Sequence, residues 1–144
     1  MKPHIDEAWR SLRLADRDIT AFDLLKNEPE VHVSIVCFHA QQAVEKSLKA
    51  VLYSRQIEFE RTHDLVKLAR LLGDHDIMLP VSVDQLRLLN PFAVTFRYDD
   101  LEIDLITRDD TTTLVTNVRQ WAEEQVSTTA VDKDAQDVQE SDRE

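Results

Sequence analysis

The chain has 144 residues, a length that suits one domain around one continuous hydrophobic core. Its formal net charge of −11 argues against a DNA-binding domain, because nonspecific binding to duplex DNA depends on Lys and Arg neutralising phosphates. No apolar run reaches the roughly 18 residues of a membrane-spanning helix, and the first ten residues lack the apolar core of a secretory signal, so we expect a cytoplasmic protein without membrane contact.

The first half of the chain predicts two long helices. The chain has one Gly and four Pro, so few residues favour tight turns. A strand-rich fold needs many such turns, and long helices are therefore expected. Residues 5–26 form the first helix, because apolar residues recur there every three or four positions. Residues 31–56 form the second, since their Ala, Gln, Glu, Lys and Leu content outweighs a short strand-like alternation at its start.

Two shorter helices are expected next. Thr62 is the predicted N-cap of the third, and Gly73 is predicted to follow its end in the left-handed conformation. A fourth helix follows Pro80 and is interrupted at Pro91, and its inward-facing residues are Val83, Leu86, Leu89 and Phe92. Residues 101–105 alternate apolar and acidic side chains, but no partner strand is evident, so we expect an ordered loop.

The last helix opens at residues 109–111, where acidic and hydroxyl residues suit a helix N-terminus, and it continues to about Gln125. The acidic segment that follows lacks aromatic residues and apolar periodicity, which is typical of disorder. The sequence therefore predicts an all-α, up-and-down bundle of about five helices over residues 1–126 and a disordered acidic tail over residues 127–144.

Several kinds of site are not expected. The single cysteine, Cys37, lies between apolar neighbours and is predicted to be a small buried hydrophobe. The five His residues never supply two ligands on one helix turn with a third nearby, so we expect no metal site. A single Gly excludes a Gly-rich phosphate loop, and we expect no bound cofactor.

The second helix carries the densest polar set. Gln42, Glu45, Lys46 and Lys49 are spaced three or four apart, so they share one side of the helix. One interpretation is a solvated face on which a Glu45–Lys49 ion pair contributes roughly 0.2–0.5 kcal/mol. The other is a surface that binds a ligand.

Three segments carry a resemblance to a known family. They are the helix Ala-Gln-Gln-Ala-x-Glu-Lys-x-Leu-Lys-Ala at residues 40–50, the His-Asp-Leu segment at residues 63–65 and the Arg-Tyr pair at residues 97–98. In this order and separation the chain closely resembles the HEPN domain family of small prokaryotic helical proteins, over most of residues 5–126. Asp99 stands where the family pattern usually has Pro.

The resemblance implies a helical bundle, a homodimer and a link to nucleotides or RNA. It also implies a nucleotidyltransferase as protein partner, in a pair of toxin–antitoxin type. Nucleases of the family carry a late Arg followed after four to six residues by His, whereas no His follows Arg97 in this chain. We therefore lean against an enzyme. Two alternatives stay open, a metal-independent ribonuclease and an assembly protein without a ligand.

Binding and catalysis would use overlapping residues. Cationic side chains and the amides of a helix N-terminus favour phosphate, which predicts an anion site between the second and third helices. The predicted ligand-binding residues are Gln42, Glu45, Lys46, Lys49, His63, Arg97 and Tyr98. RNA cleavage would need a His for proton transfer and a cation for charge stabilisation, and the candidates are His63 and Arg97. Alternatively, Arg97 only pairs with Glu45 across the bundle.

Overall fold

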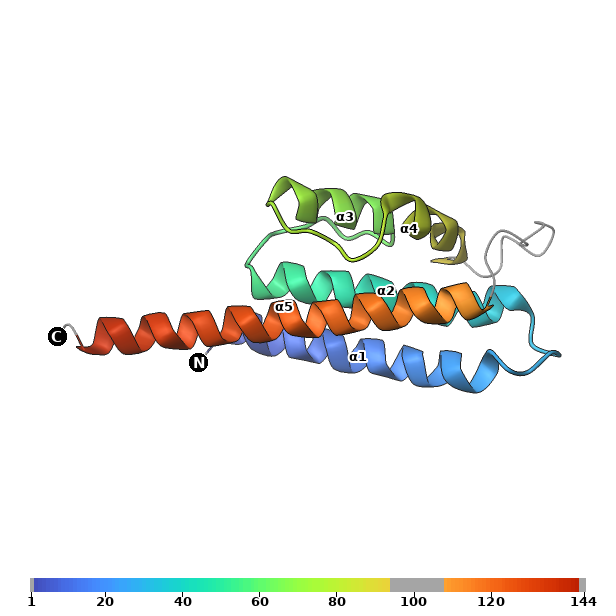
Figure 1. Cartoon of the computed structure of the whole chain (residues 1–144), viewed down its shortest axis with the longest axis horizontal. Coiled ribbons are helices and arrows are strands. Elements are labelled where there is room, and N and C mark those ends of the chain that lie inside the picture. Colours follow the sequence, from blue (N-terminus) through green and yellow to red (C-terminus); the bar gives the residue numbers. More distant parts are fainter. Residues whose placement is uncertain (1, 94–107, 143–144) are drawn as a thin grey trace.

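The computed structural model describes residues 2–93 and 108–142, with side chains as far as Val131. Its elements are α1 (Pro3–Leu25), α2 (Val33–Ser54), α3 (Leu65–Asp74), α4 (Val83–Leu89), the 3₁₀ helix η1 (Asn90–Ala93) and α5 (Arg108–Asp142). Helices α1, α2 and α5 lie side by side, and α3 and α4 form a second layer on α2 (Figure 1). The predicted all-α bundle is confirmed, and the first two helices begin and end within two residues of their predicted bounds.

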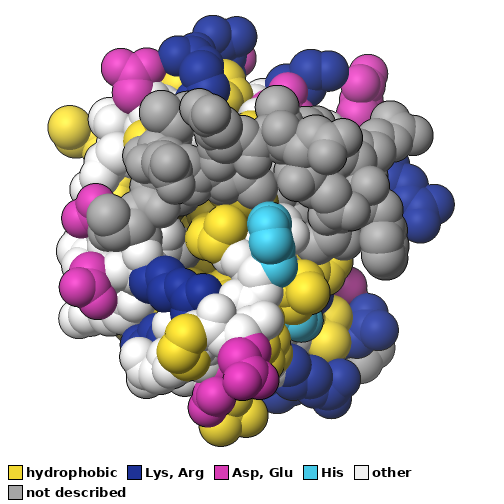
Figure 2. Space-filling view, turned by 90° about the vertical axis from the view of Figure 1, so that its right-hand side faces the viewer, with side chains coloured by type: hydrophobic (Ala, Val, Ile, Leu, Met, Phe, Trp, Pro, Cys, Tyr) yellow, Lys and Arg dark blue, Asp and Glu magenta, His cyan; other side chains and the backbone are white. Residues whose placement is uncertain are grey.

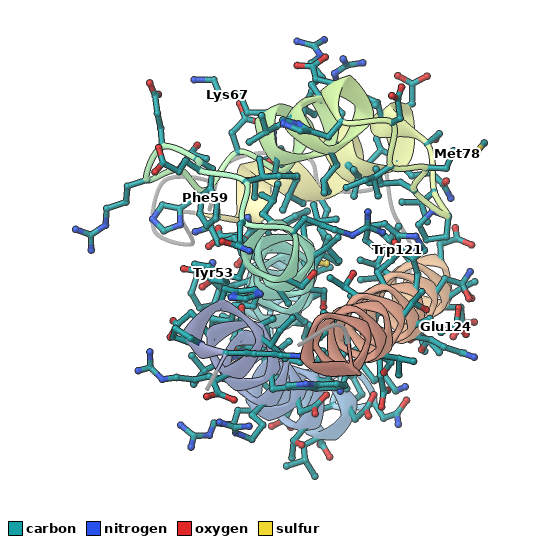
Figure 3. The ribbon with its side chains drawn as sticks, turned by 90° about the vertical axis from the view of Figure 1, so that its left-hand side faces the viewer. Tyr53, Phe59, Lys67, Met78, Trp121 and Glu124 are labelled. Atoms are coloured by element: carbon teal, nitrogen blue, oxygen red, sulfur yellow. The ribbon has the colours of Figure 1, made fainter. Side chains whose placement is uncertain are left out.

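Helix α2 is the centre of the molecule. It contacts α1, α5, α3 and η1, and the end-on view in Figure 3 shows it surrounded by the other helices. Most of its residues are buried, as expected for a helix with neighbours on several sides. Two of the buried residues, Gln41 and Glu45, carry long polar side chains, and the other buried polar residues of α2 are serines. Such groups must find partners inside the protein, because an unpaired buried carboxylate is costly.

The start of α3 differs from the prediction by two residues. The N-cap is Asp64 and not Thr62, because the Asp64 carboxylate accepts the backbone N–H of Val66 at 3.0 Å. Thr62 instead accepts the N–H of Asp64 with its hydroxyl oxygen, at 3.1 Å. The threonine therefore shapes the turn before the helix, and the aspartate caps it.

The end of α3 also differs from the prediction. Gly73 lies inside the last helical turn, and the left-handed residue is Asp76, with φ of 59°. The N–H of Ile77 donates to the carbonyl oxygen of Leu72 at 3.0 Å, so the chain closes a Schellman motif. Ile77 is buried, which explains why the helix continues past the glycine until this side chain reaches the core.

Helix α4 begins as its sequence suggests. Ser82 and Gln85 form a capping box, in which each side chain binds the other residue's backbone N–H. Leu86, Leu89 and Phe92 are buried, and Pro91 lies in η1, where the α-helix has given way to a 3₁₀ turn. The predicted interruption at the proline is therefore confirmed.

Helix α5 is longer than the sequence suggests. We expected residues 127–144 to be disordered, but the structure continues the helix to Asp142, and its end projects beyond the other helices (Figure 1). Val126 and Thr129 are still buried, so contacts in the bundle hold the first part of this segment. Adding residues to an existing helix needs no new nucleation, which lets an acidic segment follow it.

Two further findings concern the whole chain. The predicted loop at residues 101–105 lies outside the described residues. None of the described helices is long and apolar enough to cross a membrane.

Candidate functional site

Three side chains meet around the carboxylate of Glu45, and together with it they form what we call the Glu45 cluster: Gln41, Glu45, Lys49 and His63. The Glu45 side chain is 4% exposed. One of its oxygens, Oε1, lies 2.9 Å from His63 Nδ1, and the other, Oε2, lies 3.0 Å from Lys49 Nζ. Both oxygens thus have a partner, which is how a buried carboxylate becomes tolerable.

Gln41 holds the connector between α2 and α3 against this cluster. It is fully buried, and its amide donates to the backbone carbonyl oxygen of His63 at 2.9 Å. Gln42 in turn donates to the Gln41 side-chain oxygen at 2.7 Å. The position of His63 is therefore fixed through both its backbone and its ring.

This geometry determines what His63 can do chemically. Its side chain is 63% exposed, so the ring is anchored at Nδ1 and is otherwise accessible to solvent. A carboxylate at Nδ1 favours the tautomer that carries its proton there, which leaves Nε2 able to accept a proton. The arrangement suits either a hydrogen bond to a ligand or proton transfer.

Lys46 does not join the Glu45 cluster. It forms an ion pair with Asp18 of α1, and Asp18 also lies 3.2 Å from His39 Nδ1. Adjacent helical positions point in different directions, so Lys46 faces α1 while Glu45 faces the connector. Lys49 and His63 are thus brought together, and Lys46 is not.

Two predicted residues, Arg97 and Tyr98, lie outside the described residues, and so does the alternative pairing of Arg97 with Glu45. Among the described residues, the partners of Glu45 are His63, Lys49 and Gln41, whose amide nitrogen donates to Glu45 Oε1 at 3.4 Å.

The N-terminus of α3 does not offer the amides that the sequence suggested for an anion. The N–H of Leu65 donates to the Asn90 side-chain oxygen at 2.8 Å, and those of Val66 and Lys67 donate to Asp64. A hydrogen bond from Asn90 and bonds from the backbone N–H groups hold the pKa of Asp64 below its usual value, although partial burial opposes them. A charged carboxylate already occupies this helix end, so that part of the prediction is wrong.

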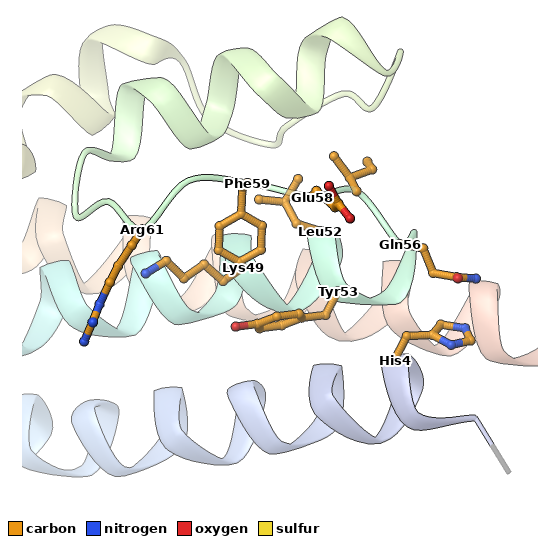
Figure 4. Close-up of a pocket in the computed structure, with 9 residues that line it drawn as sticks. His4, Lys49, Leu52, Tyr53, Gln56, Glu58, Phe59 and Arg61 are labelled. Atoms are coloured by element: carbon orange, nitrogen blue, oxygen red, sulfur yellow. The ribbon is translucent and has the colours of Figure 1, made fainter.

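A groove of about 740 Å³ opens beside the cluster, and we call it the connector groove (Figure 4). It lies between the start of α1, the end of α2 and the connector, and it is lined by His4, Lys49, Leu52, Tyr53, Gln56, Ile57, Glu58, Phe59 and Arg61. The rings of Tyr53 and Phe59 meet edge to face, 5.3 Å apart and inclined at 62°. Lys49 Nζ lies 5.9 Å from the centre of the Phe59 ring, so this lysine belongs to both the cluster and the groove.

The charge of the groove differs from that of the whole chain. Two cationic residues, Lys49 and Arg61, line it against one acidic residue, Glu58, whereas the chain carries a net charge of −11. In Figure 3 the labelled Tyr53 and Phe59 lie on the side of α2 away from α5. At the opposite end of the molecule, shown in Figure 2, basic and acidic side chains are interspersed among the described residues.

A second depression, of about 440 Å³, lies next to His63 and is also lined by Arg87, Asn90 and Pro91. Arg87 thus lines the same depression as the anchored imidazole, together with Asp64, and its guanidinium is paired with Asp84 at 2.8 Å. Within the described residues, no three His, Cys, Asp or Glu side chains are arranged to hold a metal ion.

A model of the HEPN domain family matches residues 8–126. The chain belongs to the HEPN domain family. Membership supports a nucleotide-related or ribonuclease-like module. Neither the curated proteins nor the solved structures compared with this HEPN domain gave a significant match.

Sequence reasoning missed several residues of this candidate site, namely Gln41, Tyr53, Phe59, Arg61 and Arg87. Tyr53 follows Lys49 by one helical turn, a spacing that could have marked it as a neighbour. Phe59 and Arg61 lie in the connector, where no periodicity indicates direction. Gln41 appears in the family-like motif, but only the fold shows that it binds the backbone of His63.

Proposed function

We propose that this HEPN domain binds a phosphate-bearing ligand, a nucleotide or RNA, at the surface formed by the end of α2 and the connector. The observation that carries the proposal is the gathering of Lys49, Arg61 and His63 on this one edge, beside the connector groove. Cationic side chains favour phosphate through charge-assisted hydrogen bonds, and Arg does so with two parallel donors.

Because the whole chain is acidic, phosphate binding must depend on the basic side chains at the site itself. A net charge of −11 repels anions at long range, so a phosphate must gain its binding energy from close contacts. Lys49 forms an ion pair with Glu45, which partly neutralises its charge, whereas Arg61 is exposed on the connector. Arg61 is therefore expected to contribute most to phosphate affinity, and binding should weaken as salt rises.

Calorimetric titration with AMP, with Arg61→Ala compared with Arg13→Ala, tests this proposal. Both changes remove one exposed arginine, but Arg13 lies on α1 and does not line the groove. We expect Arg61→Ala to weaken binding at least about fivefold and Arg13→Ala to leave it unchanged. At about 100 times its dissociation constant, the ligand should also stabilise the protein by roughly 2.7 kcal/mol. Equal effects of the two variants, or no binding of AMP or RNA, would contradict the proposal.

A ribonuclease is the second candidate, and the Glu45–His63 contact favours it. His63 anchored at Nδ1 can take the proton of a ribose 2′-OH as that oxygen attacks phosphorus. The bond from phosphorus to the 5′ oxygen of the next nucleotide then breaks, leaving a 2′,3′-cyclic phosphate, and His63 gives its proton to that leaving oxygen. Arg87, which lines the same depression and is paired with Asp84, can stabilise the phosphate charge. RNA incubated with the protein in a metal chelator should then be cleaved, and His63→Ala should abolish cleavage. His75→Ala is the control, because His75 is an exposed histidine at the other end of α3. Cleavage that survives His63→Ala excludes this role.

We further propose that the protein is a cytoplasmic homodimer and the partner of a nucleotidyltransferase, in a pair of toxin–antitoxin type. Support comes from the family membership. Sedimentation at micromolar concentration should give the mass of a dimer, and a monomer alone would remove that part. If no nucleotide or RNA binds, an assembly protein without a ligand becomes the better reading.

A further inference from the structure

We infer that the connector groove receives the unpaired base of a nucleotide, with Tyr53 and Phe59 contacting the base and Lys49 and Arg61 its phosphate. The inference rests on the proposed function and adds to it the residues that contact the base and the requirement that this base be unpaired. It distinguishes a ligand with a free base from phosphate alone and from a duplex.

The two aromatic rings are placed to contact a flat ligand. Tyr53 comes from α2 and Phe59 from the connector, and both are only partly buried although they pack on the core. Their edge-to-face arrangement makes a corner of the groove, with Leu52 and Ile57 adding apolar lining. Aromatic side chains bind bases of any sequence by stacking, because every base has a π face.

The charged groups lie where a phosphate attached to such a base could reach them. In Figure 4, Lys49 and Arg61 lie toward one end of the groove, while His4 and Gln56 lie toward the other. The lysine is close to the Phe59 ring, with Nζ 5.9 Å from its centre. The side chains for the base and those for the phosphate thus lie next to one another, as the base and the phosphate of one nucleotide require.

The volume of the connector groove and the accessibility of the base faces also fit a nucleotide with an unpaired base. A volume of about 740 Å³ falls within the roughly 300–1,000 Å³ of small-molecule sites. In a duplex the bases are paired and stacked inside the helix, so their faces cannot reach Tyr53 and Phe59. A free mononucleotide and single-stranded RNA both present the required base and phosphate.

The test compares ligands that differ only in the base. We expect AMP to bind at least about fivefold more tightly than ribose 5-phosphate in calorimetric titration, because only AMP can stack. Single-stranded oligo(A) should bind, and a blunt RNA duplex of equal length should bind at least about fivefold more weakly. If oligo(A) binds more tightly than AMP, single-stranded RNA is the source of the ligand; if the two bind alike, the source is a free nucleotide.

Variants locate the effect in the groove. Tyr53→Leu and Phe59→Leu keep apolar bulk but remove a ring, so each should reduce the preference for AMP over ribose 5-phosphate. Tyr53→Phe keeps the ring and should retain the preference, and the melting temperature of each variant shows whether it is folded. Should Tyr53→Leu or Phe59→Leu unfold, the ligand comparison on the unchanged protein still decides the inference.

Two results would separate failure of this inference from failure of the proposed function. Equal binding of AMP and ribose 5-phosphate, still weakened by Arg61→Ala, overturns the stacking inference and leaves the proposed function intact. Absence of binding by all four ligands overturns both.

Discussion

At the scale of single residues, burial explains the pairing of the polar groups of α2. Glu45 and Gln41 lie on a helix that is covered on several sides, so each must bind a protein partner or be desolvated without compensation. Both bind His63: Glu45 contacts its ring, and Gln41 donates to its backbone carbonyl oxygen. The same contacts that satisfy the core therefore place a histidine at the surface in a fixed orientation.

Asn90 provides a pH-dependent prediction. It donates to Asp64 and accepts from the N–H of Leu65, both at 2.8 Å, so Asn90→Ala should lower the free energy of unfolding by about 1–3 kcal/mol at pH 7. The pKa of Asp64 is lowered from 3.8 by this hydrogen bond first, so charged Asp64 stabilises the fold fully above pH 3.8. That contribution is lost as the pH falls through the lowered value.

Urea unfolding of the protein and of Asn90→Ala, at pH 7 and in steps below pH 3.8, measures this effect. The difference between the two proteins should shrink as Asp64 becomes protonated. A difference that stays constant over this range would show that Asp64 does not depend on Asn90.

Cys37 provides a reactivity prediction. Its side chain is buried at 1% exposure, and burial raises the pKa of the thiol to about 11. The thiolate is the reactive form, so a thiol reagent at pH 8 should label the folded protein slowly and the urea-unfolded protein quickly. Equal labelling rates in the two states would mean that Cys37 is accessible in the fold.

At the scale of elements, two helices end in the same way. Both α2 and α3 close with a Schellman motif whose left-handed residue is not glycine: Gln56, with φ of 57°, and Asp76, with φ of 59°. In each motif the residue that follows is a partly or fully buried isoleucine, Ile57 or Ile77. Burial of this side chain offsets the steric cost of a left-handed non-glycine residue.

Substitutions at the end of α3 test this description. Gly73→Ala should raise the free energy of unfolding by about 0.5–1 kcal/mol, because Gly73 is helical and a Cβ there meets no atom within 4 Å. Asp76→Gly should also be stabilising, by up to about 1 kcal/mol, since it removes the left-handed strain. Thermal or urea unfolding measures both. A loss of stability in Gly73→Ala would indicate that Gly73, as the sequence suggested, is the left-handed residue.

At the scale of the whole molecule, α5 joins parts of the bundle that are distant in sequence. Its first residue, Arg108, donates to the backbone carbonyl oxygens of Lys26, Glu28 and Val31, where α1 ends and turns toward α2. Farther along, Arg119 binds both carboxylate oxygens of Asp16 on α1, at 2.8 and 3.1 Å. The long helix is thus fastened at two points.

These two contacts should differ in energy. Arg108→Ala should cost at least about 2 kcal/mol of unfolding free energy, because it removes several hydrogen bonds from a charged donor and leaves carbonyl groups without that partner. Arg119→Ala should cost about 1 kcal/mol or less, since Asp16 is half exposed and its charge is hydrated once the pair is broken. Urea unfolding of both variants gives the comparison, and equal losses would contradict it.

The sequence predicted the positions of the first two helices more accurately than it predicted the contacts of the candidate site. Apolar periodicity placed α1 and α2 within two residues, because an amphipathic helix is encoded by neighbours along the chain. Spacing alone also put Lys46 with Glu45 and Lys49, whereas the fold turned Lys46 toward Asp18. The N-cap of α3 was missed because Thr62 and Asp64, two residues apart, are both residue types that favour an N-cap, and only the structure shows that Asp64 accepts the helix N–H groups.

By itself, the sequence determined the helical class, most helix positions and the buried state of Cys37, since these depend on local propensity and hydrophobic pattern. Only the tertiary structure decided that His63 meets Glu45, that Asp64 and Asn90 occupy the start of α3, and that Tyr53 and Phe59 share a groove with Lys49 and Arg61. These contacts join helices to connectors, and a connector has no periodic pattern from which its direction can be read. Their geometry follows from how the helices pack, which is a property of the whole chain.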